Sequence, residues 1–165
     1  MICLDKLDYC ASINNIKCFT NARNFTFVQG DVTDADGVLH CLRENSIDTV
    51  IHFAALLHVD RSFEAPASFA TANVIGTMTL LEAAVKCHVR RFIHVSTDEV
   101  TGEYLGEDVA SELTFKPTNP YAASKAAAEM FVEAYAKSYQ LPCIIVRSNN
   151  VYGPQQYPES KSEND

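Results

Sequence analysis

Apolar and polar residues follow two alternating patterns along the chain, one typical of strands and the other of helices. Strand-like runs, rich in apolar, β-branched and aromatic residues, lie at 1–4, 24–30, 48–55, 90–96 and 142–148. Apolar residues at helical spacing occupy intervals between these runs, at 32–46, 68–88 and 121–139. The runs at 48–55 and 90–96 are apolar throughout, as expected of strands covered on both faces of a sheet.

Residues that favour helix ends support this division. Thr33 and Asp34 are candidate N-caps for the first helix, and Pro120 stands directly before the clearest one. Strands that alternate with helices predict a parallel sheet joined by crossover helices. We therefore expect an α/β fold with a Rossmann-like, doubly wound parallel sheet, which is about one domain for 165 residues.

Composition and charge narrow the possible partners. Apolar residues make up 47% of the chain, enough for a substantial core, and the net charge is −8. An acidic chain is a poor match for nucleic acid or an anionic membrane surface, since both need a basic face. No continuous apolar run approaches the ~20 residues of a membrane span. We therefore expect neither partner.

The cysteine pattern predicts free thiols in place of a disulfide framework or a metal site. The six cysteines form no C-x-x-C pair and show no zinc-finger spacing with histidine. Small thiols of this kind are typical of a reducing compartment. The opening residues, MICLDKLDYC, show no signal-peptide pattern. We expect a cytoplasmic protein without a bound metal.

Chemically interesting residues follow the predicted strands. In doubly wound folds, ligands bind beyond the carboxyl ends of the strands. The residues at those places are Asp5, Asp31, Ala54, Ala55, Ser96, Thr97, Asp98, Glu99, Asn149 and Asn150. Ser96 to Glu99 put two hydroxyls and two carboxylates in a row at this edge. A solvated acidic loop is the alternative for Asp98 and Glu99, but an apolar strand delivers both to the expected ligand site.

One helix carries a tyrosine four residues ahead of a lysine, in NPYAASKAAAE. Tyr121 and Lys125 are expected on the same helix face, about 5–6 Å apart at Cβ. The ammonium and the helix N-terminus should both lower the phenol pKa, so that the pair could act as a base near neutral pH. An interfacial tyrosine with a solvated lysine explains the helix equally well. A second such spacing, Tyr157 to Lys161, contains Pro158 and carries little weight.

Five blocks, in this order and spacing, resemble the extended short-chain dehydrogenase/reductase family, and most closely its dTDP-glucose 4,6-dehydratases: HFAALLHVDRS, NVIGTMTLLEAA, FIHVSTDEV, NPYAASKAAAE and RSNNVYGPQQYPE. The resemblance runs from about Ile2 to Glu159. Related sugar epimerases share the Tyr-x-x-x-Lys spacing but are not expected to carry the Asp-Glu pair.

The resemblance implies NAD as cofactor, a nucleotide sugar as substrate and five catalytic residues. Tyr121 would take the proton of the sugar 4-hydroxyl, Lys125 would hold the cofactor ribose, and Thr97 would hydrogen-bond the 4-oxygen. Glu99 would then remove the C5 proton, and Asp98 would protonate the departing 6-hydroxyl. Two carboxyl groups in opposite protonation states suit such an elimination.

The resemblance also implies binding residues. Asp5 would bind the ribose hydroxyls and favour NAD over NADP. The residues expected at the cofactor are Asp5, Lys6, Asp31, Val32, Phe53, Ala54, Ala55, Tyr121 and Lys125, and Thr97 and Asn150 are expected at the substrate. Family members usually dimerise through two long helices, which would be 68–87 and 121–139 here.

The chain departs from the family pattern in several places. We expect residues 1–157 to form a partial NAD-binding domain that lacks the first strand and its G-x-x-G-x-x-G turn, followed by a non-matching polar tail at 158–165 and no substrate domain. Since the expected strand order is 3-2-1-4-5-6, the strands at 1–4 and 48–55 would each lack a neighbour. Leu57 replaces a hydroxyl residue, and Thr101 and Ala72 also differ from the family. An inactive truncated pseudoenzyme, an interaction module and an epimerase remain alternatives.

Overall fold

The computed structural model of the protein describes residues 1–102 and 114–157. The predicted polar tail at 158–165, and with it Lys161 of the second Tyr-x-x-x-Lys spacing, lies outside the described residues. The strands of the described part are β1 Ile2–Asp5, β2 Thr26–Gln29, β3 Thr49–His52, β4 Arg91–Thr97 and β5 Cys143–Ser148. Its helices are η1 Ile13–Phe19, α1 Ala35–Glu44, α2 Val59–Glu64, α3 Pro66–Phe69, η2 Ala70–Ile75, α4 Gly76–Lys86, η3 Asp98–Thr101 and α5 Pro120–Tyr139.

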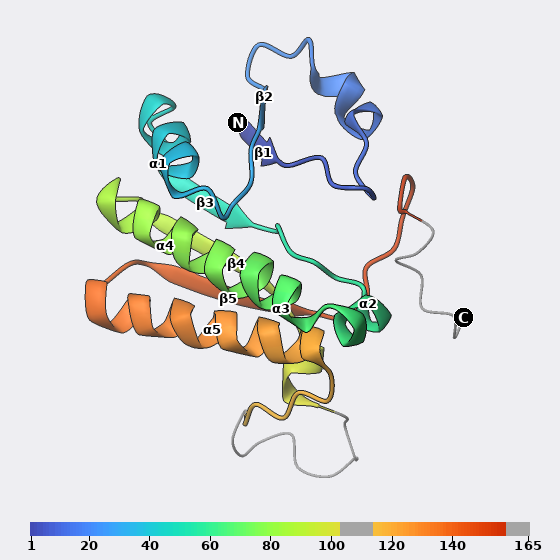
Figure 1. The fold of residues 1–165 in the computed structure, drawn as a ribbon. Helices are drawn as coiled ribbons and strands as arrows, with labels where there is room; N and C mark the ends of the chain where they lie inside the picture. The colour runs from blue at the N-terminus through green and yellow to red at the C-terminus, as the bar shows by residue number, and fades with distance from the viewer. Residues whose placement is uncertain (103–113, 158–165) are drawn as a thin grey trace.

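The strands form two separate parallel sheets. β1 pairs with β2, and β3, β4 and β5 form the second sheet in that order. Figure 1 shows β1 and β2 above the edge of the three-stranded sheet that β3 forms. The predicted parallel α/β class is therefore confirmed. Within the described residues β1 and β3 do not pair with each other, in agreement with the expectation that these two strands lack a neighbour.

Helices α1, α4 and α5 form one layer over the three-stranded sheet. α4 packs between the other two, and α5 lies against β4 and β5, as Figure 1 shows. The core lies between this layer and the sheet, with the fully buried side chains of Leu81, Phe92 and Val132 at its centre. The layer fixes the position of α5, and with it the position of Tyr121 relative to the end of β4.

The prediction that these strands are covered on both faces is wrong for the other face of this sheet. Ile51 is paired with Ile93, and Ile93 with Ile144, in one cross-strand row. Ile51 is nevertheless 54% exposed, and Phe53 just beyond it is 69% exposed. The reason is topological, because the successive crossovers from β3 to β4 to β5 run in one direction and right-handed crossovers then place both helices on one face.

Local sequence signals explain the helix ends near the site. α5 begins after Asn119, whose side-chain Oδ1 accepts the Ala122 amide at 2.7 Å, with Pro120 in the first helical position. It ends at Tyr139 and is capped by Gln140, which adopts a left-handed conformation. Of the two candidate caps for α1, Asp34 is the one that caps, accepting the Gly37 amide.

The helix predicted at 68–88 is interrupted by a π-helical stretch. α3 leads into η2, a π-helix, and α4 follows from Gly76. A Cβ at Gly76 would lie 2.6 Å from Cγ2 of Val32, so only glycine allows this close approach. The helical run therefore packs directly against the segment that follows β2, where Asp31 and Val32 lie.

Within the described residues, one helical run, Pro66–Lys86, is long and apolar enough to cross a membrane by length and composition. Its mean hydropathy reaches 1.2 although serine, threonine and asparagine interrupt every continuous apolar stretch, so the sequence contains no unbroken apolar run of that length. The same criterion is met by core helices, and 44% of this stretch is buried, so the observation is weak support for a membrane span.

Candidate active site

The first part of the candidate site is a cleft at the carboxyl ends of β1, β2 and β3. Six residues predicted at the cofactor line this cleft, namely Asp5, Lys6, Asp31, Val32, Ala54 and Ala55. Ala72, one of the departures from the family pattern, lies in the same wall. Its methyl group and those of Ala54 and Ala55 leave room for a flat ligand at this edge.

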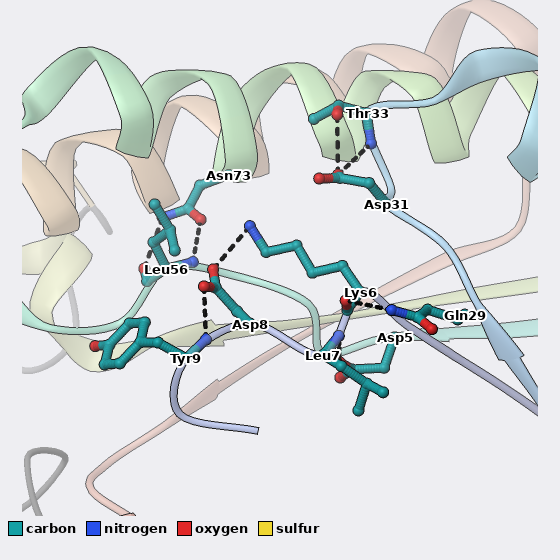
Figure 2. Close-up of polar contacts among 10 residues, drawn as sticks. All are labelled: Asp5, Lys6, Leu7, Asp8, Tyr9, Gln29, Asp31, Thr33, Leu56 and Asn73. Carbon is teal, nitrogen blue, oxygen red and sulfur yellow. Dashed lines mark hydrogen bonds and ion pairs between the residues drawn. The ribbon is translucent and has the colours of Figure 1, made fainter. Parts of the chain in front are cut away.

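Charged groups at the cleft are held by local hydrogen bonds (Figure 2). Oδ1 of Asp31 accepts hydrogen bonds from both the amide and the hydroxyl of Thr33 at 2.9 Å. The hydrogen bond from the Thr33 amide is the main reason why the pKa of Asp31 is lowered. Lys6 points toward Asp8, with Nζ 2.9 Å from Oδ2. Asp5 accepts the Leu7 amide through Oδ1 at 2.7 Å, so its Oδ2 remains available to a ligand.

Asn73 of the π-helix fixes the loop after β3. Its Oδ1 accepts the Leu56 amide at 2.7 Å, and its Nδ2 donates to the Leu56 carbonyl at 3.0 Å, as Figure 2 shows. Nδ2 also donates to the Ser124 hydroxyl on α5 at 2.8 Å. One buried amide therefore joins the cofactor cleft to the helix that carries Tyr121 and Lys125.

The second part of the site lies at the end of β4, where the chain turns into η3. Thr97 caps this turn, since its Oγ1 accepts the Glu99 amide at 3.3 Å and donates to Oδ1 of Asp98 at 3.3 Å. Thr101 closes the turn by donating to the Asp98 carbonyl at 2.8 Å. Gly102 follows with a φ of +79°, a conformation that favours glycine.

Tyr121 faces this turn from the first turn of α5. Its phenol is buried and hydrogen-bonds to the Thr97 hydroxyl. The expected low pKa is wrong for this structure, in which burial, and then the negative charges of Glu99 and Asp98, raise the pKa of Tyr121 to about 12. The Thr97 hydrogen bond opposes that rise without cancelling it.

Lys125 is only 4% exposed, and its Nζ donates to the Val95 carbonyl on β4 at 2.7 Å. Burial lowers the pKa of Lys125 to about 8, while the Glu129 carboxylate opposes the shift. Spacing alone placed the two residues on one helix but could not show where the ammonium points.

Two buried histidines lie beneath this helix layer. Nε2 of His52 is 2.9 Å from the Thr77 hydroxyl, and the ring of His94 lies 5.3 Å from that of His52. Burial, followed by the charge of Lys125, lowers the pKa of His52 to about 3 and of His94 to about 2. Both rings are therefore neutral, which favours them as uncharged packing beside Lys125.

The structure brings most predicted site residues together. Thr97, Asp98, Glu99 and Tyr121 meet at the end of β4, with Lys125 one helical turn further along α5. Two further predicted residues are exposed, namely Phe53, which directly follows β3, and Asn150, which follows β5. Leu57 is 56% exposed and lines a neighbouring hollow with His58 and Arg61.

Sequence reasoning missed two asparagines that organise the site, Asn73 and Asn119. Asn119 also donates from Nδ2 to Oε2 of Glu99 at 3.0 Å. Its place directly before Pro120 was a readable signal for a helix cap, although not for the bond to Glu99. Across residues 1–102 and 114–157, no group of three or more His, Cys, Asp or Glu could hold a metal ion.

Known proteins match this chain over nearly its whole length. The family model for GDP-mannose 4,6 dehydratase matches residues 1–164. The human dTDP-D-glucose 4,6-dehydratase is 50% identical over 159 residues, covering 96% of this chain and 45% of that protein. A trifunctional enzyme of Arabidopsis thaliana, whose first named activity is UDP-glucose 4,6-dehydratase, is 52% identical over 165 residues and is matched over 24% of its length.

A solved structure agrees with these relatives. The dTDP-glucose 4,6-dehydratase DesIV of Streptomyces venezuelae, determined with NAD and TYD bound, superposes with a TM-score of 0.91 at 41% identity. The match covers 96% of this chain and 48% of the DesIV chain. The chain thus spans about half the length of the dTDP-glucose dehydratases that it matches.

Proposed function

We propose a function for this chain as a member of the GDP-mannose 4,6 dehydratase family and, within the extended short-chain dehydrogenases/reductases, of the group of the dTDP-glucose 4,6-dehydratases. It would act in the NAD-dependent dehydration of a nucleotide-linked glucose. The product would be the 4-keto-6-deoxy sugar. dTDP-glucose is the first substrate to test. UDP-glucose is the second, since the human and Arabidopsis relatives are almost equally similar.

The residues of the cofactor cleft fit a dinucleotide. A strand-terminal carboxylate that binds ribose hydroxyls is the usual feature of such sites, and Asp5 has one oxygen left for that role. Lys6, Asp31, Val32, Ala54 and Ala55 would line the adenosine end, and Lys125 would hold the nicotinamide ribose. When bound, NAD would supply the acceptor for the C4 hydride, the donor that returns it to C6, and a positive charge in the site.

The chain's own residues would perform the proton transfers of the oxidation. Tyr121 would receive the proton of the 4-hydroxyl, and the Thr97 hydroxyl would hydrogen-bond the same oxygen. A phenol with a pKa near 12 is protonated at neutral pH, so Tyr121 needs a nearby positive charge before it can accept that proton. Lys125, one helical turn further along α5, is held at the Val95 carbonyl.

The carboxyl groups at the end of β4 would perform the elimination. Once C4 is a ketone, the C5 proton is acidic, and Glu99 would remove it. Asp98 would protonate the 6-hydroxyl as the C6–O bond breaks, so that one water leaves and a C5–C6 double bond forms. Hydride addition at C6 and reprotonation of C5 then complete the product.

The observation that carries this proposal is the meeting of Tyr121 with Thr97, Asp98 and Glu99. Both carboxylates are close enough to raise the pKa of the phenol, so the oxidation and elimination groups share one site. An epimerase needs no acid–base pair of carboxyl groups for elimination. The assembled geometry also argues against a pure interaction module, which has no use for such an arrangement.

Product analysis tests the proposal. The purified chain is titrated with NAD by calorimetry and then incubated with NAD and dTDP-glucose, and the sugars are followed by proton NMR. We expect saturable NAD binding and a new C6 methyl signal that is lost in the double variant Asp98→Asn, Glu99→Gln. A C4-inverted hexose would favour the epimerase alternative, and unchanged sugar would favour an inactive protein.

We also propose a cytoplasmic protein that forms a homodimer through the helical run at 68–87, which ends in α4, and through α5. All six cysteines are free, which supports a reducing compartment. Ile75 is 49% exposed and Met130 on α5 is 54% exposed, which supports an apolar contact on this side of the helix layer. Sedimentation analysis tests the dimer, and Met130→Glu should convert a dimer that uses this face into a monomer.

A further inference from the structure

We propose that Asn119 is a positioning residue that holds the Glu99 carboxylate in the orientation needed to take the C5 proton. This inference rests on the proposed dehydration, in which Glu99 is the base. It starts from a contact between residues 20 positions apart, in which Nδ2 of Asn119 donates to Oε2 of Glu99 at 3.0 Å. The contact spans the turn at the end of β4 and the start of α5.

The orientation of the Asn119 amide is determined by the helix that it caps. Oδ1 accepts the Ala122 amide at 2.7 Å, and the Ala123 amide donates to the backbone carbonyl of Asn119 at 2.9 Å. An amide has its acceptor on one side and its donors on the other. With Oδ1 bound to the helix, Nδ2 must face Glu99, and the reversed amide would set an oxygen against that carboxylate.

The backbone of Glu99 is held as firmly as its side chain. Its amide donates to Thr97 Oγ1 at 3.3 Å, and its carbonyl accepts the Gly102 amide at 3.1 Å. Asn119 then fixes the end of the side chain through Oε2 alone. The second oxygen, Oε1, accepts no hydrogen bond from residues 1–102 or 114–157 and stays available for a proton.

This arrangement couples the base to the helix that carries Tyr121. Asn119, Pro120 and Tyr121 are consecutive, so the cap that starts α5 sets the position of the phenol and of Glu99 together. A base must lie within hydrogen-bond reach of the proton that it removes. A Glu side chain has several rotatable bonds, and within the described residues Asn119 makes the only hydrogen bond to its carboxylate.

The competing explanation is that Asn119 is only a helix cap. Asp and Ser cap helices about as well as Asn does. The Asn119→Asp change leaves no side-chain donor and sets a second negative charge beside Glu99. The Asn119→Ser change leaves a short side chain that does not extend as far toward Glu99. These two variants therefore separate the two roles, and Asn119→Ala removes both.

The kinetic arm uses the full chain with NAD and dTDP-glucose. We expect Asn119→Asp to melt at the same temperature as wild type, whereas Asn119→Ala melts about 2–4 °C lower. The kcat of Asn119→Asp should fall by about tenfold or more at nearly unchanged KM, with reduced cofactor accumulating because oxidation at C4 continues while elimination stalls. Asn119→Ser should fall in the same direction. A kcat within about twofold of wild type for Asn119→Asp would overturn the inference.

An NMR arm is independent of turnover. In ¹⁵N-labelled protein, one Nδ2 proton of Asn119 should be shifted downfield, and that shift should disappear in Glu99→Leu, which has no side-chain acceptor, while the Ala122 amide stays in place. An unchanged Asn119 signal in Glu99→Leu overturns the inference. If wild type forms no product, the proposed dehydration fails, and the NMR arm alone decides whether Asn119 holds Glu99.

Discussion

At the scale of single residues, Tyr121 has surroundings that strongly shift its phenol pKa. The ring is buried against Phe69, with 6.4 Å between the ring centres. Two carboxylates oppose ionisation of the phenol, and Thr97 favours it. The surroundings suit a proton acceptor that becomes active only when a cation enters the site, because an added positive charge lowers a phenol pKa.

Replacing Glu99 by Gln should lower the pKa of Tyr121, because it removes the larger of the two carboxylate effects. Ultraviolet titration of wild type, with Tyr121→Phe as the reference, should show one phenol that ionises at about pH 12. In Glu99→Gln that phenol should ionise at a lower pH. An identical titration in both proteins would show that Glu99 does not face the phenol.

The buried ammonium of Lys125 should make stability depend on pH in the alkaline range. Its pKa is about 8 in the folded protein, against 10.5 for a lysine side chain in water, so between these values the unfolded chain binds the proton and the folded chain does not. Unfolding free energy should therefore rise from pH 8 to pH 10.5, by about 3 kcal/mol at most.

Lys125→Met should remove this rise. Urea unfolding at several pH values gives the free energy of unfolding of both proteins as a function of pH. The difference between the two slopes isolates Lys125, because the cysteines and tyrosines that titrate in the same range contribute equally to both proteins. Equal slopes between pH 8 and 10.5 would contradict the buried Lys125 with its lowered pKa.

At the scale of elements, α5 is joined to β5 by a buried ion pair. Nε of Arg147 lies 3.1 Å from both oxygens of Glu129, and its second guanidinium nitrogen, Nη2, lies 2.7 Å from Oε2. Glu129 is completely buried, and the Arg147 side chain is 20% exposed. Because α5 also carries Tyr121, this pair helps to fix the site at some distance from it.

Arg147→Met should destabilise the protein by about 3–5 kcal/mol, since it leaves a buried carboxylate without its partner. The double variant Arg147→Met, Glu129→Leu should recover much of that loss because the unpaired charge is gone. Chemical denaturation of the three proteins measures both effects. A double variant no more stable than Arg147→Met would contradict the interpretation.

The elements also show what the sequence could predict. Apolar runs located all five strands and the helix at 121–139 to within a few residues, because the periods of strands and helices differ. The run at 48–55 ends as a strand at His52, although its apolar character continues. Asn73 binds the amide and carbonyl of Leu56 in the loop that follows, and a contact across 17 positions leaves no local signal in the sequence.

The site was predicted unevenly for the same reason. Position after a strand placed Thr97, Asp98 and Glu99 at one edge of the sheet, and helical spacing placed Tyr121 and Lys125 on one helix. The pKa of Tyr121 was predicted in the wrong direction, because it depends on burial and on carboxylates that come from another element. Phe53 and Asn150 were expected at the ligands from family resemblance alone, and their roles stay predictions.

At the scale of the whole molecule, the helix layer is stacked on a sheet whose inner face contains neutral histidines. His52 and His94 have pKa values of about 3 and about 2, against 6.5 for a free histidine. Below pH 6.5 the unfolded chain binds protons at both sites and the folded protein does not, so stability falls as the pH falls.

This acid sensitivity should amount to several kcal/mol between about pH 6.5 and pH 3. His94→Phe should flatten the decline, since a ring of similar size without a titrating group replaces the histidine. Thermal unfolding across this pH range compares the two proteins. Parallel curves would contradict a neutral, buried His94.

The central claim is that one site oxidises the sugar at C4 and eliminates water across C5 and C6. The most direct test incubates the chain with NAD and dTDP-glucose that carries deuterium at C4, followed by mass spectrometry and NMR of the product. We predict a 4-keto-6-deoxy sugar in which the deuterium has moved to C6. Deuterium retained at C4, in unchanged or epimerised sugar, would contradict the claim.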